Sequence, residues 1–183
     1  MEQKSTFWKS AATYGLYLGI AVVLYSVILY VTGQTQNKTL GYFSFLIYVI
    51  GIVLVQINYR NRDLHGSITY GQAVGFGVAV MLFAGIIASL YNLIIFKIDP
   101  GLIEQIKAVQ EEAMLKKGMS QDQVDAAMSI TSKMMSPGWI SISGLLGSVI
   151  IGTLISLITS IFVKRPPNED DFTEVMEDVK TEE

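Results

Sequence analysis

Residues 139–163 read WISISGLLGSVIIGTLISLITSIFV and contain no Asp, Glu, Lys or Arg. A helix rises about 1.5 Å per residue, so this stretch would be about 37 Å long as a helix. The hydrocarbon core of a bilayer is roughly 30 Å thick. A soluble helix needs a solvated face, and 25 residues without a charge do not supply one. We therefore predict that residues 139–163 cross a membrane with some tilt.

Three other stretches share this lack of charge. They are residues 11–31, 42–57 and 70–96. Together the four stretches hold 89 of the 183 residues, and the mean hydropathy of the chain is +0.45. This composition excludes a soluble enzyme, a disordered chain and a nucleic-acid binder. We predict an all-α integral membrane four-helix bundle in a membrane domain of residues 1–167, and we expect residues 11–31 to be a retained span rather than a cleaved signal peptide.

The cationic residues near the span ends predict the orientation of the chain. Loops on the cytoplasmic side of a membrane protein carry an excess of Lys and Arg. One side of the predicted bundle has six such residues, and the other side has three. The six topology-setting residues are Lys4, Lys9, Arg60, Arg62, Lys164 and Arg165. We therefore expect a multi-pass protein with both termini in the cytoplasm.

Residues 98–137 connect the third and fourth spans and are too long for a structureless loop. Asp99 followed by Pro100 is typical of a helix start, and Gly118 is typical of a helix end. Ser120 and Gln123 have the spacing of a capping box at the start of a second helix. The segment is therefore predicted to be an extracytoplasmic helical hairpin, whose apolar faces pack together or lie on the membrane surface.

Small residues at four-residue spacing indicate where the spans approach one another, because lipid provides little hydrophobic drive for helix association. The predicted helix-packing residues are Gly15 and Gly19 in the first span, Gly71 and Gly75 in the third, and Gly144, Ser148, Gly152 and Ser156 in the fourth. The small-residue pattern of the third span continues with Gly85 and Ser89. Packing within one chain explains this pattern most simply. A homo-oligomer interface and a substrate groove lined by glycine are the alternatives.

An internal repeat is suggested by two similar segments. Tyr14-Gly15 with Gly19 matches Tyr70-Gly71 with Gly75, and both precede apolar runs. The repeat predicts two parallel hairpins related by a pseudo-two-fold axis along the membrane normal.

Chemistry-bearing side chains are scarce in the predicted spans. Ion coupling and catalysis within a membrane need ionisable groups, and the four stretches contain none. We expect the neutral polar residues Tyr25, Gln72 and Asn92 to form interhelical hydrogen bonds. The single histidine, His65, is expected in a solvated turn, with a phosphate or head-group contact as the alternative. The chain has no cysteine, which excludes a Cys-ligated metal. Because the spans have no ionisable group and the chain has no nucleotide-binding motif, we also expect no catalytic residues and no cofactor.

Five of the eight methionines cluster in the segment between the third and fourth spans. They are Met114, Met119, Met128, Met134 and Met135. Thioethers can bind Cu(I), but they also provide adaptable packing or a pliable surface for a partner. Because no His or Cys accompanies them, packing is the favoured explanation.

The tail, residues 168–183, is strongly acidic. It has 1 basic and 8 acidic residues, whereas residues 1–167 have 12 basic and 8 acidic residues. Four apolar residues nevertheless share one helical face, namely Phe172, Val175, Met176 and Val179. These residues are a candidate docking face for a basic, apolar-lined groove of a partner, and a solvated disordered tail is the alternative.

Several short motifs resemble those of a known family. The segments Tyr70-Gly71-Gln72-Ala73, Ile98-Asp99-Pro100, Lys117-Gly118-Met119-Ser120 and Ser136-Pro137-Gly138 precede the small-residue ridge of residues 147–158. In this order and spacing, from about Phe7 to Arg165, the chain resembles the domain of unknown function 4199 family. These are four-span bacterial membrane proteins, common in the Bacteroidetes group. The resemblance implies a bacterial inner membrane and supplies no catalytic residues.

The sequence therefore predicts a non-enzymatic integral inner-membrane protein that serves as an accessory or scaffold component of an envelope assembly. The alternative is a small carrier or flippase-type component for a lipid or amphipathic molecule. A sensor or exporter of a soft metal, based on the methionines, is a third hypothesis. The expected partners are membrane lipid, another membrane or envelope protein and a second copy of the chain, but not nucleic acid.

Overall fold

The computed structural model describes residues 2–165 and contains six helices in that range. Four are long: α1 Glu2–Val31, α2 Lys38–Asp63, α3 Tyr70–Ile98 and α6 Pro137–Val163. Two are shorter and lie between α3 and α6: α4 Gly101–Lys116 and α5 Gln121–Lys133. Each long helix is long and apolar enough to cross a membrane. The predicted all-α fold with four membrane-spanning helices is confirmed.

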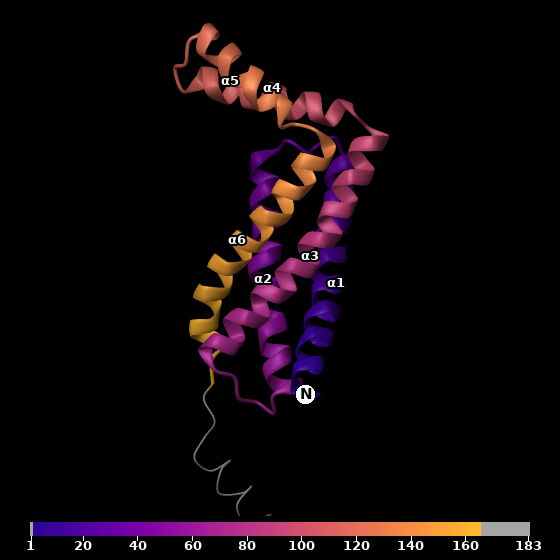
Figure 1. Ribbon diagram of the computed structural model, residues 1–183, viewed down its shortest axis with the longest axis vertical. Helices are drawn as coiled ribbons and strands as arrows, with labels where there is room; N and C mark the ends of the chain where they lie inside the picture. The colour runs from indigo at the N-terminus through magenta and orange to yellow at the C-terminus, as the bar shows by residue number, and fades with distance from the viewer. Residues whose placement is uncertain (1, 166–183) are drawn as a thin grey trace, which may run out of the picture.

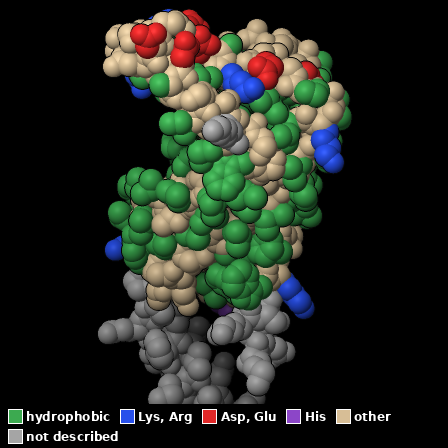
Figure 2. All heavy atoms as spheres, turned by 45° about the horizontal axis from the view of Figure 1, so that its top comes forward, with side chains coloured by type: hydrophobic (Ala, Val, Ile, Leu, Met, Phe, Trp, Pro, Cys, Tyr) green, Lys and Arg blue, Asp and Glu red, His purple; other side chains and the backbone are tan. Residues whose placement is uncertain are grey.

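The long helices run alternately up and down the bundle. In Figure 1, α1 and α3 rise from the end that holds the N-terminus, and α2 and α6 return to it. The α4–α5 hairpin crosses the opposite end and overhangs the bundle. Figure 2 shows hydrophobic side chains covering the visible face of the bundle, with acidic side chains gathered on the hairpin. The surface of the bundle is therefore suited to lipid, and the acidic part of the hairpin surface to water.

The third span is the centre of the bundle. α3 packs extensively against both α1 and α6, whereas α2 makes much smaller contacts with all three. Among the largest fully buried side chains are Ile52, Phe76, Val80 and Met81. The phenyl ring of Phe76 stacks on the ring of Tyr59, with centroids 3.7 Å apart. The core is consequently densest in the half of the bundle that contains the N-terminus.

The predicted internal repeat is wrong. Related hairpins would require α1 to pack on α2 as α3 packs on α6, but the first contact is minor and the second is extensive. The matching Tyr-Gly segments of α1 and α3 share a sequence pattern without sharing an environment. Gly15 packs tightly on a neighbouring helix, and Gly71 lies in open space within residues 2–165.

Local sequence signals explain where the helices begin. The carboxamide oxygen of Asn37 accepts a hydrogen bond of 3.0 Å from the Thr39 backbone N–H at the start of α2. Thr69 and Gln72 form a capping box at the start of α3, so Gln72 caps a helix instead of joining two spans. At the start of α6 the Ser136 hydroxyl accepts from the backbone of Trp139.

The hairpin forms from the two predicted helices. The Asp99 carboxylate accepts a hydrogen bond of 3.0 Å from the Gly101 backbone N–H, and the Gln123 side chain accepts one of 3.0 Å from Ser120. Gly118 ends the turn between them with a φ of +83°, a left-handed conformation that favours glycine. On the exposed surface of α4, a hydrogen bond from Lys116 lowers the pKa of the Glu112 carboxyl.

Candidate functional site

The small-residue ridge of α6 packs directly against α3. A Cβ built on Gly152 would lie 2.5 Å from the Cβ of Met81, which is closer than real Cβ atoms approach. Ser148 and Ser156 of α6 similarly occupy the space in front of glycines of α3. The three facing pairs are Gly77–Ser156, Met81–Gly152 and Gly85–Ser148. Each helix therefore presents a small residue where the other presents a larger one.

The two predicted glycines of α1 also approach α3. A Cβ on Gly15 would lie 2.5 Å from the Cβ of Phe83 and 2.8 Å from the backbone oxygen of Val80. A Cβ on Gly19 would lie 3.2 Å from the Cα of Ala84. These close backbone approaches place α1 on one side of α3 while α6 occupies another.

Within residues 2–165, Gly71 and Gly75 do not pack against another helix, contrary to the prediction of packing within one chain. A Cβ built on either glycine would meet no atom of residues 2–165 within 4 Å. Gly144 has only a loose neighbour, the Asn92 carboxamide nitrogen at 3.9 Å from its built Cβ. The glycines of α3 that face α6 are Gly85, which the small-residue pattern included, and Gly77, which it did not. Gly77, Met81 and Gly85 follow one another at intervals of four residues, so the sequence alone places them on one face of the helix.

A buried glutamine joins three of the spans. The side chain of Gln56 is fully buried in α2, and no sequence pattern pointed to this role. Its amide nitrogen donates to the backbone oxygen of Ala73 at 3.0 Å and to the hydroxyl of Ser160 at 3.1 Å. Its carbonyl oxygen accepts a hydrogen bond of 2.9 Å from the Thr159 hydroxyl. The full satisfaction of this amide explains how it is tolerated in the core.

The other polar residues of the spans have separate roles. The Tyr25 hydroxyl donates to the backbone oxygen of Leu40 at 2.8 Å, which joins α1 to the start of α2 as predicted. The Ser89 hydroxyl donates to the backbone oxygen of Ser141 at 3.0 Å and joins α3 to α6. Asn92 lies at the same end of the bundle and borders a cavity.

The predicted topology-setting residues lie at one end of the bundle. The Arg60 guanidinium donates to the backbone oxygen of Val163 at the end of α6, 3.0 Å away. Arg165 pairs with Ile68 through two backbone hydrogen bonds of 2.8 and 2.9 Å. The exposed side chains of Lys9, Arg62 and Lys164 belong to the ends of α1, α2 and α6 that meet here. Lys4 belongs to the beginning of α1 at this end.

The structure describes His65 but not the candidate docking residues of the tail. His65 is exposed in the turn between α2 and α3, with a φ of 51°, in agreement with the expected solvated turn. The candidate docking residues of the tail lie outside the described residues. They are Phe172, Val175, Met176 and Val179.

Within residues 2–165, no group of three or more His, Asp or Glu side chains could hold a metal ion.

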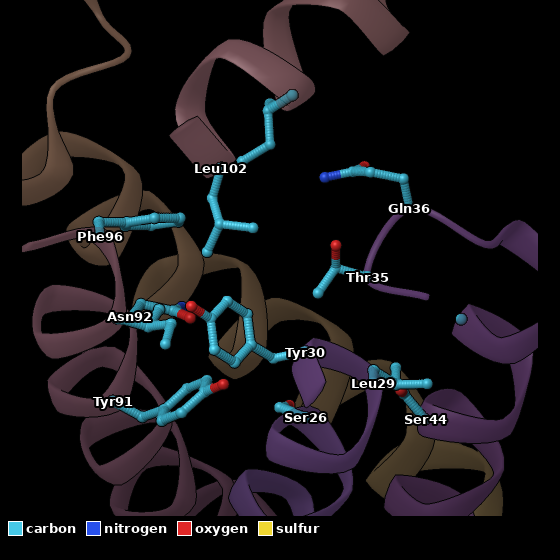
Figure 3. Close-up of a pocket in the computed structure, with 13 residues that line it drawn as sticks. Ser26, Leu29, Tyr30, Thr35, Gln36, Ser44, Tyr91, Asn92, Phe96 and Leu102 are labelled. Carbon is cyan, nitrogen blue, oxygen red and sulfur yellow. The ribbon is translucent and has the colours of Figure 1, made fainter. Parts of the chain in front are cut away.

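A cavity of about 280 Å³ lies beneath the hairpin, at the end of the bundle opposite the N-terminus. No sequence pattern predicted it. Figure 3 shows the side chains of Tyr30 from α1, Tyr91 and Asn92 from α3 and Leu102 from α4 converging on this space. The full lining is Ser26, Leu29, Tyr30, Thr35, Gln36, Gly41, Ser44, Tyr91, Asn92, Ile95, Phe96, Leu102 and Ile106. Aromatic and aliphatic walls thus surround several neutral polar groups.

A second space, of about 380 Å³, lies between α2 and α6. It shares Gly41 and Ser44 with the cavity beneath the hairpin. Its other lining residues are Phe45, Tyr48, Met81, Gly144, Gly147, Ser148 and Ile151. We call the first space the outer cavity and the second the lateral groove. The lateral groove ends near Met81, where the packing of α3 on Gly152 closes the bundle.

The chain was compared with known protein families, curated proteins and solved structures. Residues 13–165 match the family described as protein of unknown function DUF4199. The chain belongs to the DUF4199 family. No curated protein and no solved structure matched the chain.

The DUF4199 match includes every residue of the outer cavity and the lateral groove. It also includes the Gln56 hydrogen bonds and ends at Arg165, the residue paired with Ile68. The acidic tail, residues 168–183, lies outside the matched range. The family therefore corresponds to the four spans and their hairpin.

Proposed function

We propose that this DUF4199 protein is a non-enzymatic integral protein of a bacterial inner membrane, and that it serves as an accessory or scaffold component of an envelope assembly. In this proposal both termini are cytoplasmic and the α4–α5 hairpin is periplasmic. The four spans anchor the chain, and the hairpin presents a surface to another envelope protein. Membrane lipid surrounds the spans, and the chain has no nucleic-acid partner.

The exposed apolar side chains of the hairpin are the observation that carries the proposal. Ile130 and Met134 of this region are 66% and 49% exposed, although they lie outside the four long helices. The hairpin overhangs the bundle, so the bundle does not cover all of its surface (Figure 1). The two side chains are four residues apart, and neighbouring exposed apolar side chains on an otherwise polar element favour a contact surface.

The packing of the bundle supports an anchoring role. Ser148, Gly152 and Ser156 pack against α3, and Gln56 closes the half of the bundle nearest the N-terminus. A bundle closed in this way resists relative movement of its spans. Leu102 of α4 packs with Ile95 and Phe96 of α3, which attaches the hairpin to this base.

Site-specific photo-cross-linking in the native host tests the proposal. A benzophenone amino acid at Ile130 should form a discrete adduct with another envelope protein, and Ile130→Asp should prevent the same protein from co-purifying. The matched control places the benzophenone at Phe162, which is 82% exposed on a membrane-spanning helix and should react with lipid. Adducts with lipid alone at both positions would contradict the scaffold function, and an adduct of twice the chain's mass would make a second copy the partner.

A carrier for a lipid or amphipathic molecule is the second candidate function. The outer cavity and the lateral groove favour it, because a carrier needs space at membrane depth. The closed half around Phe76 and Gln56 opposes a continuous path across the membrane. Transport of a fluorescent lipid by the purified chain in liposomes would favour this function over the scaffold.

A further inference from the structure

The outer cavity and the lateral groove share two lining residues near the start of α2. Gly41 and Ser44 border both spaces. Gly41 has no side chain, and a Cβ built there would meet none of the described atoms within 4 Å. No side chain at position 41 therefore separates the two spaces where they share this residue.

The outer cavity offers neutral hydrogen-bonding groups. The hydroxyls of Tyr30, Thr35 and Tyr91 and the carboxamides of Gln36 and Asn92 border it (Figure 3). Hydroxyls and carboxamides each provide donors and acceptors without a charge. These five side chains form no hydrogen bond to another residue of the range 2–165, so their capacity is available to a ligand or to water.

The lateral groove offers apolar contact. Phe45, Tyr48, Met81 and Ile151 supply its larger side chains, and Gly144 and Gly147 widen it. From Gly144 to Ile151 the helix rises about 10 Å, so the groove follows the outer part of the span. Phe45 and Ile151 are half exposed on the surface that would face lipid. An alkyl chain can therefore enter the groove from the bilayer.

The absence of charge from the lining restricts the ligand. None of the described residues that border the two spaces is Asp, Glu, Lys, Arg or His. A charged head placed in the cavity would lose hydration without gaining an opposite charge, which is unfavourable. A hydroxyl or amide would instead find partners among Tyr30, Tyr91 and Asn92.

We propose that the outer cavity and the lateral groove form one binding site for a neutral amphiphile. Its hydroxyl- or amide-bearing head occupies the outer cavity, and a single alkyl chain passes Gly41 into the lateral groove. The two volumes are near the lower end of the range of ligand pockets, roughly 300–1,000 Å³, which suits one small head and one chain. This site goes beyond the scaffold function and requires no transport across the membrane.

Photolabelling of the purified chain in nanodiscs tests the site. The probes are a monoacylglycerol and a lysophosphatidate with the same diazirine-bearing alkyl chain, and mass spectrometry locates the adducts. The neutral probe should label the groove around Phe45 and Ile151 roughly tenfold more than the anionic probe, a preference equivalent to about 1.4 kcal/mol. Unlabelled monoacylglycerol should compete.

Two substitutions address the two parts of the site. Gly41→Leu should obstruct the passage between the spaces and reduce labelling of the groove by about tenfold, whereas Asn92→Leu should reduce the preference for the neutral probe. Gly75→Leu is the matched control, because Gly75 is also an exposed helical glycine with open space around it in the described structure. Its labelling should equal that of the unsubstituted chain.

Three results would overturn the proposal. Equal labelling by the two probes, or adducts spread over lipid-facing residues such as Phe162, would show surrounding lipid only. Groove labelling that persists in a Gly41→Leu variant would show that the spaces act separately. If Gly41→Leu unfolds at a lower temperature than Gly75→Leu, its loss of labelling could reflect misfolding. The proposal is then tested by the probe preference of the unsubstituted chain and by the reduction of that preference in Asn92→Leu. Cross-linking at Ile130 is a separate measurement, so the scaffold function can fail while this site stands.

Discussion

Met81 of α3 fills the space that Gly152 of α6 leaves open. A Cβ added to Gly152 would lie 2.5 Å from both the Cβ and the Cγ of Met81. The pairs one helical turn above and below, Gly85–Ser148 and Gly77–Ser156, have the reverse order of small and larger residue. This alternation sets the antiparallel register of the two helices and permits their close approach.

The Met81–Gly152 contact predicts a loss of stability when the space is filled. Gly152→Ala should lower the free energy of unfolding by about 1–3 kcal/mol, because the added methyl forces the helices apart. Unfolding in mixed micelles of a mild detergent and dodecyl sulfate measures this change. Gly71→Ala is the control and should change stability by less than about 1 kcal/mol. Equal effects of the two substitutions would contradict the register.

Replacement of Gln56 should weaken the joint between α2, α3 and α6. Gln56→Leu removes three hydrogen bonds, each contributing about 0.6 kcal/mol within a membrane, so a loss of about 1–2 kcal/mol is expected. Asn58→Leu in the same helix is the control, because the Asn58 side chain donates only to Leu54 of its own helix. The same unfolding assay applies. A Gln56→Leu variant as stable as the control would exclude a structural role for the buried amide.

Replacement of Ser156 should not lower stability, in contrast to replacement of Gln56. Its hydroxyl is buried and finds no hydrogen-bond partner within residues 2–165. A buried polar group without a partner costs about 1–3 kcal/mol, so Ser156→Ala should leave stability unchanged or raise it. Ser148→Ala is the comparison, since the Ser148 hydroxyl donates to the backbone oxygen of Leu145. Destabilisation by Ser156→Ala beyond that of Ser148→Ala would show that the hydroxyl is bonded in the membrane.

Deletion of residues 168–183 separates the two hypotheses for the tail. If Phe172, Val175, Met176 and Val179 dock on a basic groove, the truncated chain should lose a co-purifying protein and keep its unfolding free energy. Affinity purification in a gentle detergent, followed by mass spectrometry, makes the comparison. An unchanged set of co-purifying proteins would remove the docking hypothesis.

The helices could be predicted because hydropathy and capping act locally. A stretch without charge must be solvated by lipid, and this requirement alone locates the four spans near residues 11–31, 42–57, 70–96 and 139–163. The hairpin followed from Asp99, Gly118 and Ser120, whose backbone preferences do not depend on distant residues. The observed helices extend beyond these stretches where polar residues cap them.

The packing could be predicted only in part, because spacing does not identify the facing helix. Gly71 and Gly75 have the same four-residue spacing as Gly15 and Gly19, yet they meet open space in the described structure. Gln56 lies near the end of an uncharged stretch, and its burial depends on partners more than 100 residues away. The outer cavity likewise arises from residues of four helices and a loop that only the fold brings together.

Accessibility of single cysteines tests the orientation of the four spans most directly. The chain contains no cysteine, so Lys117→Cys in the hairpin and Ser67→Cys in the connection between α2 and α3 each introduce one thiol. We predict that a membrane-impermeant maleimide applied to spheroplasts labels Lys117→Cys, and that it labels Ser67→Cys only after lysis. Labelling of Ser67→Cys in intact spheroplasts, with Lys117→Cys protected until lysis, would contradict the proposed orientation.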